Sequence, residues 1–100
     1  YYFLDNEYYF KRRGLYGFYD DGERFAFFSR AVLETLFYID FTPDIINCND
    51  WQTALVPVYL NLYYRHLDKF NRIKTVFTIH NIASATVTST LWNTMAAPTL

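Results

Sequence analysis

The hydrophobic positions between residues 21 and 38 follow the period of a helix. They recur at three- and four-residue steps, at Phe25, Phe28, Val32 and Leu36. Asp20 stands just before this run and Glu23 stands three positions later, which is the spacing of a capping box. The pattern therefore predicts a helix over residues 21–38 that begins at Asp20.

A second helical pattern covers residues 51–66, where the apolar steps are Leu55, Val58 and Leu62. Pro57 lies inside this stretch. Because proline has no backbone N–H, it either kinks the first turns or moves the start of the regular helix to a later residue. Both alternatives fit the sequence.

Three runs are typical of strands: residues 1–4, 44–48 and 74–79. The last run is the strongest, since β-branched residues dominate it. Residues 5–19 mix charged and aromatic side chains with two glycines, which indicates a loop with tight turns. Strands separated by helices of this length pair in parallel through right-handed crossovers. We therefore predict an α/β fold, as one half of a doubly wound sheet.

Composition narrows the class of protein. Hydrophobic residues make up 52% of the 100-residue chain, charged residues 19%, and the formal net charge is −1. This balance is typical of a globular protein and favours neither nucleic acid nor an anionic membrane as partner. No apolar run reaches the roughly 18 residues that a membrane-spanning helix needs.

Aromatic residues make up 22% of the chain. A chain this short buries only part of such large side chains, so we expect open apolar surface unless further chain covers it. Cys48 is the only cysteine, which excludes an intrachain disulfide and suits a reducing compartment. We interpret Cys48 as a small buried apolar residue.

Polar side chains follow each predicted strand, at 5–6, 49–51 and 80–81. In open α/β sheets, ligands bind beyond the carboxyl ends of the strands. The sequence contains no cluster with metal-ligand spacing, no phosphate-binding loop and no nucleophile elbow. We therefore expect no metal and no bound cofactor.

Three stretches carry a family resemblance. They are residues 5–25, with DNEYYFKR, LYG and DDGERF; residues 43–54, PDIINCNDWQTA; and residues 74–83, KTVFTIHNIA. In this order and spacing the chain resembles the starch and glycogen synthases. The resemblance covers residues 1–83 and does not extend to residues 84–100. It departs from the family at Asn47, where histidine is usual, so a proton-related role there is in doubt.

The resemblance implies part of the N-terminal domain of a GT-B glycosyltransferase, whose two Rossmann-like domains face a cleft. It implies transfer of glucose from ADP-glucose to the non-reducing end of an α-1,4-glucan, with retention and without a metal. It also implies a cytoplasmic setting, with a plastid as the alternative. The family's donor loop and second domain supply further catalytic groups, so we expect this chain alone to be inactive.

The resemblance also suggests site residues, each with a structural alternative. His80 would bind the donor glucose, or be an ordinary loop histidine; Asp50 would stabilise charge at the anomeric carbon, or cap the helix from Trp51. The other candidates for substrate binding are Asn49, Trp51, Asn81 and Tyr9. Trp51 and Tyr9 could equally pack in the interior, and Asn81 could cap a turn.

Two other classes of protein remain open at this stage. One is a non-catalytic α/β binding module that shares ancestry with the synthases. The other is a decayed or mis-assembled reading frame, which the change of character after residue 83 suggests.

Overall fold

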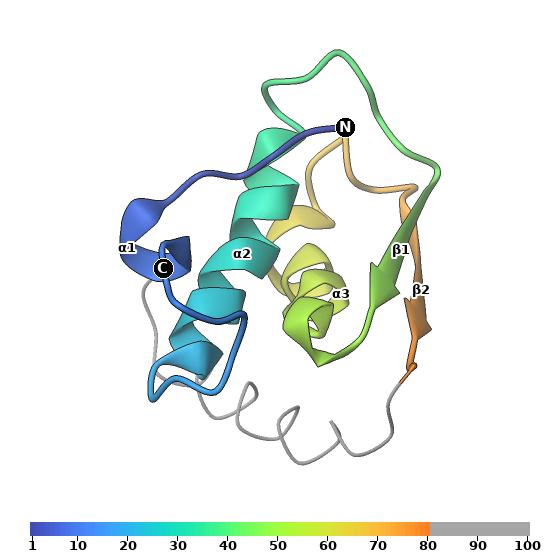
Figure 1. Ribbon diagram of the computed structural model, residues 1–100. Coiled ribbons are helices and arrows are strands. Elements are labelled where there is room, and N and C mark those ends of the chain that lie inside the picture. The colour runs from blue at the N-terminus through green and yellow to red at the C-terminus, as the bar shows by residue number, and fades with distance from the viewer. Residues whose placement is uncertain (81–100) are drawn as a thin grey trace.

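In the computed structural model, which describes residues 1–80, the helices gather on one side of a small parallel sheet (Figure 1). The elements in chain order are α1 (Glu7–Phe10), α2 (Asp21–Thr35), β1 (Ile45–Asn49), the 3₁₀ turn η1 (Trp51–Thr53), α3 (Leu55–Tyr59), the π-helical turn η2 (Leu60–Tyr64) and β2 (Lys74–Thr78). α2 packs against α3.

β1 and β2 pair in parallel, with Ile45 opposite Lys74 and Asn49 opposite Thr78. Both strands lie within one residue of the predicted bounds, and the parallel pairing is confirmed. Because parallel strands need a crossover, the chain between them folds back through η1, α3 and η2.

The predicted helix over residues 21–38 is confirmed as α2, whose last regular residue is Thr35. The predicted cap is wrong, because the side chain of Asp20 makes no capping hydrogen bond. Its two carboxylate oxygens instead accept hydrogen bonds from the guanidinium of Arg12, each at 2.9 Å. A charge-assisted bidentate pair is stronger than a neutral cap, and this one holds the pKa of the Asp20 carboxyl below its usual value.

The second helix begins later than its apolar pattern predicts. Residues 51–53 form one 3₁₀ turn, and the α-helix starts at Leu55. Pro57 therefore lies in the first turn of α3, where backbone N–H groups have no intrahelical partner in any case. The later start is the second of the two alternatives that Pro57 left open.

The predicted strand at residues 1–4 is wrong. The segment is not assigned as a strand, and Tyr1, Tyr2 and Phe3 are exposed. A strand needs a partner for its backbone groups, and the sheet described for residues 1–80 consists of β1 and β2 alone. The predicted loop at 5–19 also contains one short helix, α1, capped by Asn6.

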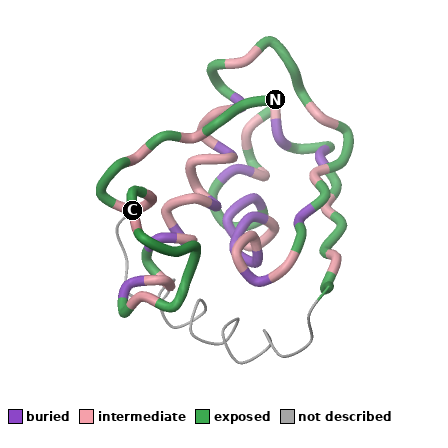
Figure 2. Tube along the Cα trace, viewed as in Figure 1, coloured by how far each residue is buried: buried purple, intermediate pink, exposed green. Residues whose placement is uncertain are grey.

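The buried residues concentrate in α3 and on the side of α2 that faces it (Figure 2). Leu60 and Tyr64 of η2, Phe70 and Ile73 before β2, and Cys48 of β1 belong to the same core. The interpretation of Cys48 is confirmed: it is 2% exposed, and burial raises the pKa of its thiol to about 11.

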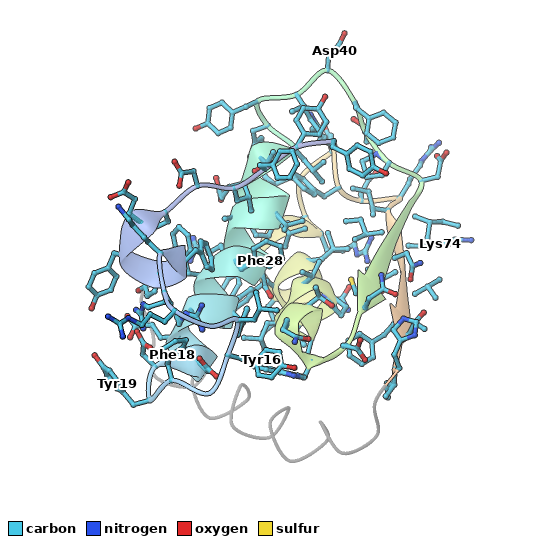
Figure 3. All side chains as sticks on the ribbon, in the orientation of Figure 1. Tyr16, Phe18, Tyr19, Phe28, Asp40 and Lys74 are labelled. Carbon is cyan, nitrogen blue, oxygen red and sulfur yellow. The ribbon has the colours of Figure 1, made fainter. Side chains whose placement is uncertain are left out.

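The other face of the sheet is open. Ile45 and Val76, which lie on this face, are 56% and 49% exposed. The helices in Figure 1 lie only on the opposite side of the strands. Several aromatic side chains of the N-terminal loop are exposed as well, among them Tyr19, which points outward in Figure 3. The expectation of open apolar surface is confirmed for residues 1–80.

Candidate functional site

The candidate site lies at the carboxyl edge of the sheet, where β1 and β2 end side by side. Asn49 and Thr78 are partners in register, so the chain leaves both strands at the same edge. The backbone N–H of Asp50 donates to the carbonyl of Thr78 at 2.9 Å, which extends the ladder by one bond. Residues 49–50 and 79–80 therefore meet there.

Asp50 and His80 are in direct contact. Oδ1 of Asp50 accepts a hydrogen bond from the backbone N–H of His80 at 2.7 Å. The pairing of the two parallel strands thus brings these two residues together at one edge of the sheet. The alternative of Asp50 as a helix cap is wrong, since its side chain makes no capping bond to η1.

The backbone of Asp50 is strained. Its φ and ψ are 62° and 179°, and it is the only non-glycine residue in the described range 1–80 with positive φ. This region is essentially restricted to glycine, and another residue there costs about 1–3 kcal/mol. Thr53 holds the turn, because its hydroxyl lies 2.9 Å from the carbonyl of Asn49 and 3.0 Å from that of Asp50.

Asn49 contacts the ring of His80. Its Oδ1 lies 3.0 Å from Nε2 of the imidazole, and both residues are exposed. The structure thus brings together three of the residues suggested by the sequence, Asn49, Asp50 and His80. Their functional roles stay predictions.

Trp51 lies beneath this edge in the core. It is 7% exposed, and its ring packs edge-on against Phe25 at 4.8 Å and Tyr16 at 6.2 Å between ring centroids. This is the interior packing that the sequence left open. The little exposed ring surface disfavours stacking on a sugar.

Tyr9 is directed to α2 rather than to the sheet edge. Its hydroxyl donates to Oε1 of Glu23 at 2.7 Å, and its ring packs against Phe27. The hydrogen bond to Glu23 is the main reason that the pKa of Tyr9 is raised to about 12. Substrate binding by Tyr9 stays a prediction. Asn81 lies outside the described residues.

A hollow of about 500 Å³ lies between the N-terminal loop, α2 and the sheet edge. Phe10 and Tyr16 line it from the loop, Phe28 lines it from α2, and Asn49 borders it from β1. The labels in Figure 3 place Tyr16 at the lower end of the molecule and Phe28 along α2. The hollow therefore adjoins the Asn49–His80 contact and has mostly apolar walls.

Arg24 borders the hollow but was not among the site residues suggested by the sequence. It is 2% exposed and donates to the carbonyls of Tyr9 at 2.6 Å and Leu15 at 3.3 Å, and to Oδ1 of Asp21 at 2.7 Å. It thereby fixes the loop that forms one wall of the hollow. In the sequence, the two adjacent aspartates lie between Arg12 and Arg24. This arrangement was the feature that could have indicated ion pairs between the loop and α2.

Two negative findings concern residues 1–80. No group of three or more His, Cys, Asp or Glu side chains there could hold a metal ion. None of the helices there combines the length and apolar character that crossing a bilayer demands.

Sequence comparison identifies related proteins. The family profile described as starch synthase catalytic domain matches residues 1–99. Glycogen synthase of Clostridium acetobutylicum is 65% identical over 83 residues, and glycogen synthase of Caldicellulosiruptor bescii is 62% identical over 82 residues. Each alignment covers 82% of this chain and 17% of the relative. The chain thus spans about a sixth of the length of these relatives.

Structural comparison agrees. The catalytic domain of starch synthase IV from Arabidopsis thaliana, bound to ADP and acarbose, is similar with a TM-score of 0.62 and 46% identity. The similarity covers 73% of this chain and 15% of that chain. The fold is that of a partial α/β, Rossmann-like unit from such a domain. The predicted division at residue 83 stays a prediction.

Proposed function

Because the chain belongs to the starch synthase catalytic domain family, we propose that it forms one wall of the donor site of a glycosyltransferase. The complete enzyme would transfer glucose from ADP-glucose to the non-reducing end of an α-1,4-glucan, with retention. The observation that carries this proposal is the contact between Asp50 and His80 at the carboxyl edge of two parallel strands. Ligands of doubly wound sheets bind at this edge.

Each residue has a role in the proposal that suits its chemistry. The exposed imidazole of His80 can hydrogen-bond a hydroxyl of the donor glucose. The carboxylate of Asp50 can stabilise positive charge on the sugar ring as the bond to the diphosphate breaks. Groups held rigidly before the reaction stabilise such charge best, and the strained, hydrogen-bonded turn at Asp50 supplies that rigidity.

The rest of the enzyme is required in this proposal. The chain spans 17% of its bacterial relatives, and the leaving diphosphate needs groups on the other side of the cleft. ADP in the starch synthase IV structure supports a nucleotide-linked donor. A cytoplasmic setting, as expected from the resemblance, belongs to the same proposal. We predict no measurable glucose transfer by the 100-residue chain alone.

A chimeric enzyme tests the proposal. Residues 1–83 replace the aligned segment of glycogen synthase from Clostridium acetobutylicum, which is 65% identical. We expect the chimera to transfer glucose from ADP-glucose to glycogen. We expect His80→Ala and Asp50→Asn to lower kcat/KM by roughly 100-fold or more, because each removes a group that stabilises developing charge.

His66→Ala is the matched control, since His66 is the chain's other histidine and is exposed. It should leave kcat/KM within about twofold of the chimera. A folded chimera without activity would contradict the proposal, and so would full activity of the His80→Ala variant.

A further inference from the structure

We propose that Asn49 is a positioning residue that holds the imidazole of His80 by its Nε2 atom and presents Nδ1 to the substrate. In this proposal Asn49 does not itself bind sugar. The inference rests on the proposed function, in which His80 contacts the donor glucose.

His80 is held at two points by consecutive residues. The carboxylate of Asp50 accepts from its backbone N–H at 2.7 Å, and the amide oxygen of Asn49 lies 3.0 Å from Nε2 of its ring. The first bond places the main chain, and the second restricts rotation of the ring. An exposed ring without the second bond could occupy several rotamers.

The strain at Asp50 explains how both bonds form. In an extended strand, consecutive side chains point to opposite faces, so Asn49 and Asp50 would be directed to opposite sides of the sheet. The positive φ of 62° at Asp50 takes the chain off the extended path. The hydroxyl of Thr53, close to the carbonyls of Asn49 and Asp50, supports this turn.

The contact also favours one tautomer of the His80 ring. The amide oxygen of Asn49 can only accept, so a hydrogen bond in this contact requires the proton on Nε2 of His80. In the neutral ring Nδ1 is then an acceptor. Within residues 1–80, no hydrogen bond is found to Nδ1 of His80. A sugar hydroxyl would therefore donate to Nδ1.

A double-mutant cycle in the chimeric synthase separates positioning from direct sugar binding. We expect Asn49→Leu to lower kcat by about 10- to 100-fold, since slight misplacement of a catalytic group has effects of this size. The KM for ADP-glucose should change less than about threefold. In a His80→Ala background the same substitution should change kcat by less than about threefold, because its effect passes through His80.

Two variants complete the test. Asn49→Asp keeps an acceptor oxygen at the same reach and should retain kcat within about fivefold of the chimera. Asn47→Leu lies two residues earlier on β1, is also exposed, and should leave kcat within about twofold.

Several outcomes would overturn the inference. One is an equal loss from Asn49→Leu with and without His80, which would mean that Asn49 binds sugar directly. Others are unchanged kcat in Asn49→Leu, or failure of that variant to fold where Asn47→Leu folds. An inactive unsubstituted chimera, or a fully active His80→Ala variant, would instead count against the proposed function.

Discussion

Asp50 carries a carboxylate at a backbone position that suits glycine. Its φ of 62° and ψ of 179° lie where a Cβ atom is crowded. Glycine would relieve the strain but would leave the backbone N–H of His80 without its present acceptor. At the scale of the residue, stability and the proposed function therefore favour different side chains.

Substitutions at Asp50 should measure this strain. Asp50→Gly and Asp50→Ala both remove the carboxylate, so they differ in backbone freedom. We expect the glycine variant to be more stable than the alanine variant by about 1 kcal/mol, which is the relieved strain less the entropy that glycine loses on folding. Urea denaturation of the 100-residue variants, followed by circular dichroism, measures the difference.

The control is Ala54→Gly, at a position with φ of −61°. There glycine should be the less stable residue, by about 1 kcal/mol. Equal stability of the two Asp50 variants would show that the turn relaxes and stores no strain.

At the scale of elements, the N-terminal loop is held to α2 by two arginines. Arg12 pairs with Asp20 just before α2, and Arg24 reaches from α2 to the carbonyls of Tyr9 and Leu15. Arg24 also lies over the ring of Phe18 at 5.0 Å. These contacts join segments that have little regular structure of their own, so the loop depends on them.

Removal of the buried arginine should loosen the loop. We expect Arg24→Met to lower the free energy of unfolding by about 3 kcal/mol, because it leaves the Asp21 carboxylate and two carbonyl groups without their buried donor. Urea denaturation gives the value. Arg13→Met, at an exposed position of the same loop, should change it by less than about 0.5 kcal/mol. Similar values for the two variants would mean that Arg24 does not anchor the loop.

The helical period and the strand runs were sufficient to predict α2, β1, β2 and the parallel pairing. These patterns gave wrong predictions where the structure depends on contacts with residues distant in the sequence. Tyr1, Tyr2 and Phe3 have strand-forming side chains but are exposed and unassigned to a strand. Asp20 has the spacing of a cap, yet a guanidinium eight residues away binds its carboxylate. Local propensity cannot predict whether a side chain will bind its own helix or a more distant residue.

At the scale of the whole molecule, one face of the sheet is open and the other packs on the helices. Ile45 and Val76 are exposed on the open face, where their partners in register are Lys74 and Asn47. Parallel sheets are normally covered on both faces. The exposed face is therefore consistent with a segment that spans about a sixth of its relatives' length.

The open face should bind a hydrophobic dye. We expect the native 100-residue chain to enhance the fluorescence of anilinonaphthalene sulfonate, because apolar side chains are exposed there. The double variant Ile45→Thr, Val76→Thr should enhance it less. The thiol of Cys48, which is buried and has its pKa raised to about 11, should react slowly in both chains if the core is formed.

The contrary result has a clear meaning. No dye binding by the native chain, with Cys48 protected, would favour a self-contained binding module. Dye binding that the double variant does not reduce would place the open apolar surface elsewhere.

The sequence by itself determined the local elements and the family. Apolar period specifies α2, β-branched runs specify β1 and β2, and the DNEYYFKR, NCNDWQTA and TVFTIHN motifs specify the relationship to starch and glycogen synthases. These features depend on residues that are near one another in the chain.

The tertiary structure alone decided how the site is assembled. The bonds from Asn49 and Asp50 to His80 join residues 31 and 30 positions apart. Their geometry depends on the register of two strands and on a positive φ at Asp50. A side chain's partner at that separation is determined by the packing of the whole fold, because no local preference of either residue selects it.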